Sequence, residues 1–493
     1  MSDKDTQPLT GKDLARKPRG FPDKREGLIH AQAKLVETVT GVYRKWGFEA
    51  LETGAFEYAD ALGKFLPDDD RPNAGVFAIQ DDDEQWMSLR YDLTAPLARF
   101  IAEAGQTVGR PFRRYAAGPV WRNEKPGPGR FREFWQCDAD TVGAPGFHAD
   151  AEMIAMGAEA LRAVGMETGE FVIRVNTRRL LNGVLERIGA FTPESRLSVL
   201  RALDKLDRLG ESGVADLLGQ GRLDESGDYT EGAGLAPRQI DFVLQFASSR
   251  APTRQETLTN LDQLVVGSEE GWNGYNELRS IVEALDAMDV PEGDVVIDPS
   301  VVRGLEYYTG PVYEAELLRE VTGDDGKTYR IGSIGGGGRY DDLVARFTGE
   351  TVPATGFSVG ISRLASALAI MGETVKLDGP VVVLNLDKDS PAVALEIATL
   401  LRRAGLRAEA YMGGSGMKGQ MKYADRRGAP AVVMVGSNEI EAGTVTIKDL
   451  EMGALKAKAI QSNEAYRDAR PGQIEVPRAE MVEAVRRIVE AQG

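Results

Sequence analysis

The sequence predicts an α+β core that is interrupted by a helical segment and followed by a separate α/β domain. Three observations favour this fold class. The chain has 493 residues, too many for one compact core, and at about 150 residues per domain it should contain about three domains. Two strand-like runs flank a Pro/Gly turn within residues 110–142. Beyond residue 379, strand and helix patterns alternate, as is typical of an α/β domain with a partly parallel sheet.

The N-terminal part is predicted to begin with a flexible arm over residues 1–20. Apolar residues then recur at helical spacing over residues 28–46, which predicts a helix that Gly47 ends. A strand is expected over residues 48–56. The first 19 residues are polar and contain no apolar stretch, so we expect no secretory signal.

Residues 110–142 predict two strands joined by the turn Lys125–Gly129. Side chains alternate between the faces of a strand. Over residues 130–140 the odd positions are mainly apolar, and Glu133 is the exception. The even positions form a mostly polar face with one aromatic ring: Arg130, Arg132, Phe134, Gln136, Asp138 and Asp140.

An antiparallel pairing through this turn can bring Arg122 and Glu124 to the same polar face. Arginines suit phosphate oxygens, an aromatic ring can stack on a base, and acids suit a cationic or hydrogen-bonding substrate. The alternative is a solvated face, although Phe134 would then have no reason to be there.

The middle of the chain is predicted to be mainly helical from about residue 185 to residue 290. Within it, leucines recur every three residues from Leu197 to Leu209. Thr192 and Pro193 suit the start of that helix and Gly210 its end. We interpret this stripe as core packing rather than as a cofactor site.

The remaining elements are expected at the following positions. A helix and a strand precede the helical segment, at residues 146–165 and 171–175. Short strands follow it at 295–315, 329–334 and 356–360, and the last runs into a helix that ends at Met371. The C-terminal pattern is a strand at 381–384, a helix at 391–403, a strand at 408–411, a helix at 418–427 and a strand at 431–435.

Composition limits the functional class. Hydrophobic residues make up 42% and charged residues 27%, which excludes a mainly disordered, collagen-like or membrane-spanning chain. The single cysteine, Cys137, excludes an internal disulfide framework and a cysteine-based zinc cluster. Two histidines, His30 and His148, leave little for a histidine metal site or a catalytic triad. We expect no metal held by protein ligands, and a reducing cytoplasmic location.

The charge distribution is uneven. The acidic residues outnumber the basic ones by 76 − 59 = 17, which by itself argues against a nucleic-acid partner. Residues 109–132, however, hold seven basic side chains and one acid, and residues 401–430 hold seven basic side chains and two acids. An acidic body with two basic segments fits a protein that meets phosphate groups at defined places.

The sequence contains no standard phosphate-binding or calcium-binding loop that would explain the basic segments. A P-loop reading of Gly326-Lys327-Thr328 fails because Val321 stands where a glycine is required. The run Gly335–Gly338 does not fit a dinucleotide fingerprint and suggests close packing or a turn. Asp81–Asp83 lacks the spacing of a calcium loop, and a solvated turn is the simpler interpretation.

Longer motifs resemble the class II aminoacyl-tRNA synthetases. Arg122-Asn123-Glu124 with Arg130–Phe134 resembles motif 2, and Pro353–Leu364 resembles motif 3, with Ser362-Arg363 where Glu-Arg is common. Arg303–Gly310 and Gly335–Tyr340 are similar to signature segments of the histidyl-tRNA synthetase family. Two further segments, Gln420–Asp425 and Val445–Leu450, resemble the anticodon-binding domain of that family.

The resemblance implies the class II synthetase fold, an α+β catalytic core with a mainly antiparallel sheet of six or more strands. It places the core at residues 21–185 and 291–375, a helical insertion at 186–290 and an α/β anticodon-binding domain at 379–493. The implied function is that of a histidine–tRNA ligase. This enzyme uses ATP, with Mg²⁺, to activate L-histidine to histidyl-adenylate and transfers it to the 3′ end of tRNA(His). A homodimer without membrane contact is also implied.

The resemblance also implies roles for individual residues. Arg122 and Arg303 would be catalytic, gripping the α-phosphate and the substrate carboxylate from two sides. The remaining roles divide between the two substrates. ATP would also contact Glu124, Arg130, Phe134 and Arg363. Histidine would also contact Asp92, Leu93, Thr94, Gln136, Asp140, Tyr307 and Tyr308.

Three alternatives stay open at this point. The chain could be a catalytically inactive paralogue that regulates histidine biosynthesis, although such regulators lack the C-terminal domain. It could instead be a class II synthetase for proline or threonine, against which the segment Arg303–Gly310 argues. In the C-terminal domain, the basic residues at helical spacing from Lys418 to Arg427 fit either a solvated helix face or a platform for the anticodon.

Overall fold

The computed structural model describes residues 11, 14–62, 75–127, 130–223, 227–302, 308–322, 328–329, 331–371, 379–387, 391–457 and 472–492. The chain divides into two compact units, Met1–Val375 and Lys376–Gly493. Each unit has its own hydrophobic core.

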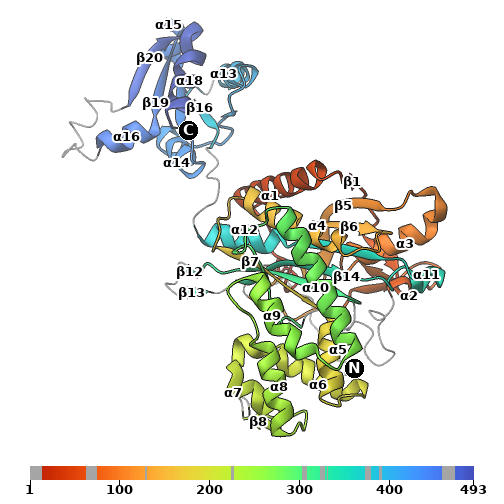
Figure 1. Cartoon of the computed structure of the whole chain (residues 1–493). Coiled ribbons are helices and arrows are strands. Elements are labelled where there is room, and N and C mark those ends of the chain that lie inside the picture. Colours follow the sequence, from red (N-terminus) through yellow and green to blue (C-terminus); the bar gives the residue numbers. More distant parts are fainter. Residues whose placement is uncertain are drawn as a thin grey trace. The chain divides into compact units, whose positions relative to one another are not determined.

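The first unit is built on a mixed sheet, in which eight strands are described (Figure 1). Only the two outermost pairs, β1–β5 and β7–β10, are parallel, and the other five pairs are antiparallel. This confirms the mainly antiparallel sheet. In spatial order the strands are β1 (Glu49–Ala50), β5 (Phe112–Trp121), β6 (Glu133–Val142), β15 (Ala354–Val359), β14 (Gly332–Arg339), β11 (Pro311–Leu317), β7 (Phe171–Thr177) and β10 (Val295–Ile297).

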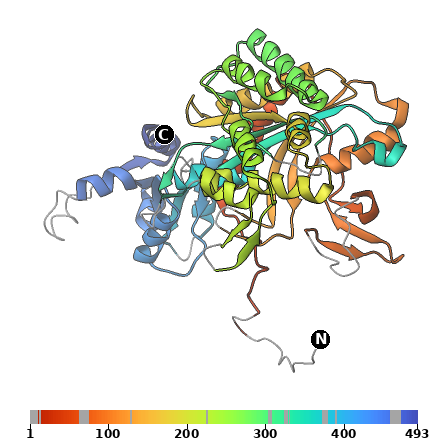
Figure 2. The ribbon, with the colours of Figure 1, turned by 60° about the horizontal axis from the view of Figure 1, so that its bottom comes forward.

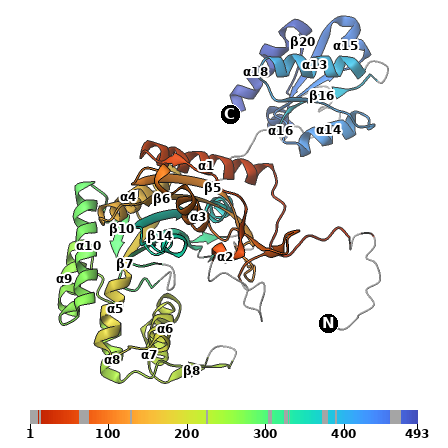
Figure 3. The same cartoon turned by 90° about the vertical axis from the view of Figure 1, so that its right-hand side faces the viewer.

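The main core includes residues of the helices α1 (Glu26–Lys45), α4 (His148–Ala163), α10 (Glu269–Ala287) and α12 (Ile361–Ile370). Figure 3 shows α1, α4 and α10 next to the sheet. Helix α1 contacts α4 and α12, and α4 contacts β15. The approach of α4 depends on Gly157, because a Cβ there would lie 2.7 Å from the ring of Phe357. The odd-numbered face of β6 points into this core, with Cys137 and Ala139 fully buried, as the alternation predicted.

A smaller three-stranded sheet has the spatial order β2 (Phe56–Tyr58), β4 (Trp86–Leu89) and β3 (Ala78–Gln80). Helices α2 (Ala59–Leu62) and α3 (Thr94–Ala104) and the 3₁₀ turn η3 (Gly105–Thr107) belong to the same region. The strand predicted over residues 48–56 is only partly correct. Its residues begin in the main sheet as β1 and end in the small sheet as β2, so the connecting residues 51–55 form no strand.

The stretch from residue 185 to residue 290 is mainly helical, as its pattern predicted (Figure 2). Its leucine stripe is core, because Leu200 and Leu203 are buried. Thr192 caps the first helix of that stripe, accepting a hydrogen bond from the amide of Ser195 at 3.2 Å. The prediction of a single helix that ends at Gly210 is wrong, because two helices cover this stretch. The described elements are α5 (Arg178–Arg187), α6 (Pro193–Leu203), α7 (Leu206–Leu218), β8 (Gly221–Leu223), β9 (Tyr229–Glu231), α8 (Pro237–Ala247) and α9 (Arg254–Val265).

Gly210 interrupts α7 rather than ending it. Its φ of 67° is non-helical, a conformation open to glycine at little cost, and the chain resumes its helix afterwards. A short two-stranded sheet, β12 (Val321–Thr322) with β13 (Thr328–Tyr329), and the helix α11 (Ala345–Thr348) complete the first unit.

The second unit is an α/β domain with a five-stranded sheet. Strands β17, β16 and β18 are parallel, whereas β18, β19 and β20 are antiparallel, which confirms the partly parallel sheet. In spatial order the strands are β17 (Ala408–Ala410), β16 (Val381–Asn385), β18 (Ala431–Val435), β19 (Thr444–Asp449) and β20 (Gln473–Pro477). The helices are α13 (Pro391–Arg403), α14 (Met417–Arg426), α15 (Ser437–Ala442), α16 (Leu450–Ala457), η4 (Arg478–Glu480) and α18 (Met481–Gln492).

Each predicted element from residue 381 to residue 435 is confirmed to within two residues. The central strands β16, up to Leu384, and β18 are continuously apolar, which fits their two faces packing against separate apolar clusters. Among the described residues, no helix has both the length and the apolar character that crossing a membrane requires.

Candidate active site

The hairpin of β5 and β6 sets the geometry of the candidate site. Its antiparallel register runs from Phe112 opposite Val142 to Trp121 opposite Glu133. The pairing continues beyond the strands, where the amide of Arg122 donates to the carbonyl of Arg132 at 2.9 Å. The even-numbered residues of β6 therefore share one face with their partners on β5. The alternative interpretation of a solvated face is wrong for the two acids on this face, because Asp138 is only 3% exposed and Asp140 only 2%.

Arg122 lies just beyond β5, against two aromatic rings. Its Cζ is 4.3 Å from the centre of the Tyr91 ring and 5.1 Å from that of Phe134. Its Nε also donates to the carbonyl of Tyr91 at 3.3 Å. Because a guanidinium is planar and stacks on aromatic faces, these contacts orient Arg122 at the end of the even-numbered face.

Asp140 is held by two protein groups. The buried Arg114, directly opposite on β5, brings Nη2 to 2.9 Å from its Oδ2, and the hydroxyl of Tyr340 donates to its Oδ1. Burial raises the pKa of Asp140, and Arg114 and Tyr340 oppose that shift. Arg114 also donates to the carbonyl of Leu93 at 2.7 Å, so it links Asp140 to the segment that precedes α3.

Arg114, Asp138 and Ser358 were not among the sequence-predicted site residues. Asp138 was recognised on the polar face but given no role, and its pKa is raised to about 7 by burial and by Asp140. Arg114 could have been found from the hairpin turn, because pairing symmetric about Gly127 places it opposite Asp140. Ser358 lies on β15, and only the strand order brings it opposite Asp138.

Gln136 lies one step along the same face. Its Nε2 donates to Ser358 Oγ at 2.7 Å. Its Oε1 is buried and has no hydrogen-bond partner among the described residues. This oxygen can accept a hydrogen bond from a substrate.

Asp92 and Thr94 lie at the start of α3. The Oδ1 of Asp92 accepts from the amides of Thr94 and Ala95 at 3.0 and 2.8 Å, so it caps the helix. Asp92 also lies near the polar face, because its charge contributes to raising the pKa of Asp138. Leu93 contributes its backbone to the site, since its side chain is buried and its carbonyl holds Arg114.

Tyr308 lies over the glycine-rich strand β14. A Cβ at Gly338 would lie 2.7 Å from its ring. Cβ atoms at the other three glycines of the run would likewise lie 1.9 to 2.8 Å from backbone atoms. The run is therefore a close-packing device, as predicted. Burial, followed by the charges of Asp92, Asp138 and Asp140, raises the pKa of Tyr308.

The ATP-binding candidates have different surroundings. Arg363 lies in the first turn of α12, as predicted, and its Nη1 donates to the carbonyl of Ser333 at 2.6 Å. Glu124 accepts from the hydroxyl of Tyr91 at 3.4 Å. Arg130 is exposed, and its backbone pairs with that of Gly127. Arg303 and Tyr307 lie outside the residues that the structure describes.

Ser362, which stands where motif 3 commonly has an acid, has a definite contact. Its Oγ accepts from the amide of Trp135 at 2.9 Å. The first turn of α12 is thereby joined to β6, the strand that carries Gln136 and the two buried acids.

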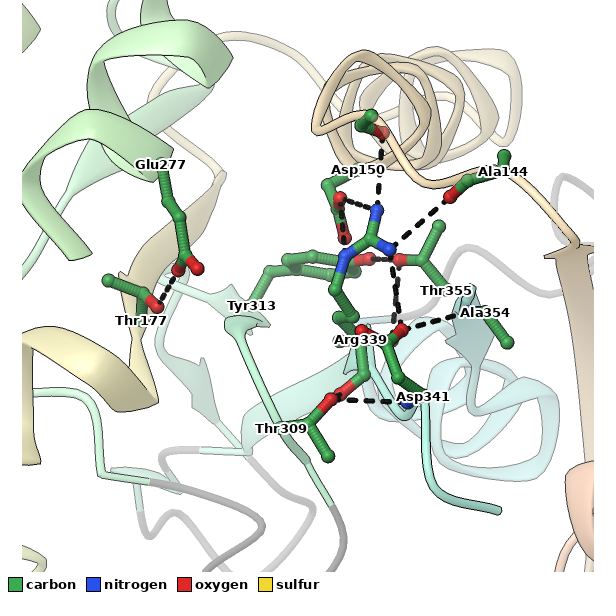
Figure 4. Close-up of polar contacts among 12 residues, drawn as sticks. Ala144, Asp150, Thr177, Glu277, Thr309, Tyr313, Arg339, Asp341, Ala354 and Thr355 are labelled. Atoms are coloured by element: carbon green, nitrogen blue, oxygen red, sulfur yellow. Dashed lines mark hydrogen bonds and ion pairs between the residues drawn. The ribbon is translucent and has the colours of Figure 1, made fainter. Parts of the chain in front are cut away.

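A buried ionic cluster supports the segment after Tyr308 (Figure 4). Arg339, only 3% exposed, donates to Asp150 on α4 and to the carbonyl of Ala144 at 3.3 Å. Its own carbonyl accepts from the amide of Thr309 at 2.8 Å, which fixes the residue that follows Tyr308. Burial raises the pKa of Asp150 to about 6, against the opposing charge of Arg339.

Known proteins resemble this chain along most of its length. The family model described as histidyl-tRNA synthetase matches residues 20–364, and that described as anticodon binding domain matches residues 380–488. A histidine–tRNA ligase from Caulobacter vibrioides is 58% identical over 478 residues, which cover 96% of this chain and 97% of that relative. One from Brucella ovis is 55% identical over 486 residues, with 97% of each chain covered.

Among solved structures, that of a histidyl-tRNA synthetase from a Nostoc species matches with a TM-score of 0.69 and 29% identity, covering 96% of this chain and 99% of that one. A family model over most of the chain and curated relatives of more than half identity point to the same conclusion: the chain belongs to the histidyl-tRNA synthetase family.

Proposed function

We propose that this chain activates L-histidine with ATP to form histidyl-adenylate, and then transfers the histidyl group to the 3′ end of tRNA(His). The single observation that carries the proposal is one sheet face with opposite charges at its two ends. Arg122 lies at one end, and the buried acids Asp138 and Asp140 lie towards the other. This arrangement fits a substrate that has an anionic reacting group at one end and nitrogen donors at the other.

In the first step, a carboxylate oxygen of histidine attacks the α-phosphorus of ATP, and pyrophosphate leaves. Charge grows on the non-bridging oxygens as this happens, so fixed positive groups accelerate the step. We assign Arg122 to the α-phosphate and the carboxylate, with Arg303 on the opposite side. The contacts of Arg122 with Tyr91 and Phe134 support this role, because they orient its guanidinium before the substrate arrives.

The rest of ATP is assigned to the neighbouring residues. Arg363 and Arg130 would hold the γ-phosphate, and ATP would enter as its Mg²⁺ complex. Phe134 would stack on adenine and Glu124 would lie at the edge of the base. The place of Arg363 in the first turn of α12 supports its role, because backbone amides at a helix start also favour anions.

Histidine would be selected by groups that need its nitrogen atoms. Asp92, Thr94 and Gln136 would receive the α-ammonium group, and the open Oε1 of Gln136 supports this. Asp140 and Tyr308, with Tyr307 beside them, would face the imidazole. Arg114 and Tyr340 each engage one oxygen of Asp140. A carboxylate oxygen has two acceptor positions, so each can still accept from an imidazole N–H.

Selectivity follows from the cost of leaving buried polar groups without partners. An amino acid without imidazole nitrogens would leave Asp140 and Tyr308 unpaired inside the protein. In the second step, the terminal ribose hydroxyl of tRNA attacks the activated carbonyl and AMP leaves. We assign anticodon binding to the second unit, whose basic helix α14 supports a contact with phosphates.

Cellular context completes the proposal. We expect a cytoplasmic homodimer, and the one cysteine, Cys137, is buried and free, which suits a reducing compartment. The alternative of an inactive regulator of histidine biosynthesis is not favoured, because residues 380–488 match the anticodon-binding domain that such regulators lack.

The test is amino-acid-dependent exchange of labelled pyrophosphate into ATP by the purified chain. Exchange should require histidine, and proline or threonine should give no more than the signal without amino acid. Equal exchange with proline or threonine would reject the assignment. No exchange with any amino acid, together with intact binding of ATP, would favour the regulator.

A further inference from the structure

We propose that Asp138 and Ser358 are positioning residues that hold the side-chain amide of Gln136 with its oxygen towards the α-ammonium group of the substrate. The inference rests on the proposed function, because it takes Gln136 as a receptor for that group. It adds two residues to the site and gives each a defined task.

The three side chains lie next to one another on two neighbouring strands. Ser358 on β15 is directly opposite Asp138 on β6, and Gln136 is the next residue of β6 on the same face. The Nε2 of Gln136 donates to Ser358 Oγ at 2.7 Å. Ser358 also acts on the carboxylate of Asp138 and opposes the rise in its pKa, and Asp138 is only 3% exposed.

The direction of these hydrogen bonds follows from donor and acceptor counting. An ionised carboxylate can only accept, so the one proton of the Ser358 hydroxyl goes to Asp138. The hydroxyl can then only accept from Gln136, and only the NH₂ end of the amide satisfies it. The carbonyl end of Gln136 must therefore point the other way.

The carbonyl end is the part that a substrate would meet. Within the described part of the chain, Oε1 of Gln136 is buried and accepts no hydrogen bond. A buried acceptor without a donor is costly, and an ammonium group supplies three donors. Asp138 therefore acts on the substrate through Ser358 and Gln136 without touching it.

If the direction of the hydrogen bonds from residue 138 through Ser358 to Gln136 is reversed, the side-chain amide of Gln136 should rotate by half a turn. In an Asp138→Asn variant, the new side chain can donate to Ser358, which then has a proton to give to Gln136. The amide would turn its NH₂ group towards the ammonium and repel it. In a Ser358→Ala variant, the amide loses its anchor and takes no fixed orientation.

Two ligands separate recognition of the ammonium from other effects. The amino alcohol analogue of histidine keeps the ammonium and imidazole groups, whereas imidazolepropionate lacks the ammonium group. We would measure the Kd of each by calorimetry at pH 8.5, above the pKa of about 7 that burial and Asp140 give Asp138. Each single variant should weaken binding of the amino alcohol on the order of tenfold and leave the Kd of imidazolepropionate unchanged.

The controls address folding and additivity. Ser249→Ala removes another serine hydroxyl, bonded to the backbone of the helical insertion, and should change neither Kd. The KM for ATP should stay constant in all variants. Asp138 acts through Ser358. The double variant Asp138→Asn/Ser358→Ala should therefore bind the amino alcohol as tightly as Ser358→Ala alone.

The inference would be overturned if the two substitutions had additive effects on binding of the amino alcohol, or if they weakened binding of both ligands equally. The proposed function would stay intact in either case. If Gln136→Ala does not change binding of the amino alcohol, the assigned role of Gln136 fails and the inference fails with it. If the wild-type chain shows no histidine-dependent exchange, the proposed function itself fails.

Discussion

Glu277 offers a test of the energetics of the first unit that is independent of catalysis. It lies on α10, is only 3% exposed and accepts a hydrogen bond from Thr177 (Figure 4). Its Oε1 also lies 3.2 Å from the Nε of Arg179. Burial raises its pKa to about 7 from an ordinary 4.5, although Thr177 and Arg179 both act in the opposite direction. The folded protein therefore holds this proton more tightly than the unfolded chain.

The sign of the pH effect follows from this. Because the folded pKa is higher, the contribution of Glu277 to stability is fully present below the unfolded pKa and is lost as the pH rises through the folded value. With pKa values of 4.5 and about 7, linkage gives a loss of about 2.5 kcal/mol in the free energy of unfolding between pH 5 and pH 8. A Glu277→Gln variant carries no such proton and should not show this loss.

The assay is urea unfolding of wild type and Glu277→Gln at pH 5 and pH 8, followed by tryptophan fluorescence, since Trp272 lies on the same helix. The difference between the two proteins should shift in favour of the variant by about 2.5 kcal/mol at the higher pH. Glu283→Gln is the matched control, because Glu283 is on α10 but 71% exposed. A difference that is the same at both pH values, as expected for the control, would refute the reasoning.

Two other perturbations probe packing around the site. Arg339→Met removes the partner of the fully buried Asp150 and should cost about 3–5 kcal/mol of unfolding free energy at pH 8. Adding Asp150→Asn should restore part of this loss, and no restoration would contradict the ionic explanation. Gly337→Ala would place a Cβ 1.9 Å from the carbonyl oxygen of Gly356, and should cost about 1–3 kcal/mol or more. In Gly27→Ala the Cβ meets no atom within 4 Å, so a melting temperature equal to that of Gly337→Ala would refute the steric argument.

Several features of the β5–β6 hairpin could be predicted from the local sequence pattern alone. Alternation along residues 130–140 placed Cys137 and Ala139 in the core and the acids on the opposite face, and both placements are confirmed. The turn centred on Gly127 also implies the pairing of Arg114 with Asp140. These features follow from the two-residue period of a strand and from the geometry of one turn, and both are local properties of the chain.

Two predictions are wrong where a local pattern is compatible with two conformations. Gly210 is a helix stop by pattern, but tertiary packing lets α7 continue through it with a kink. Residues 48–56 carry one strand-like pattern, yet the chain there passes from one sheet to another. Secondary-structure propensity describes which conformations a segment tolerates. The strands and helices that pack against the segment decide which of these it adopts.

By itself, the sequence determined the class of fold, the elements from residue 381 to residue 435, and the polar face of β6, because periodicity and turn chemistry need no distant partner. Only the tertiary structure brought Ser358 opposite Asp138 and Arg339 onto Asp150, which are separated by 220 and 189 residues. Such contacts depend on strand order and helix docking, and these are set by packing of the whole core rather than by any local pattern. The electrostatics of the site, including the raised pKa of Asp138, arise from burial that exists only once those distant segments have met.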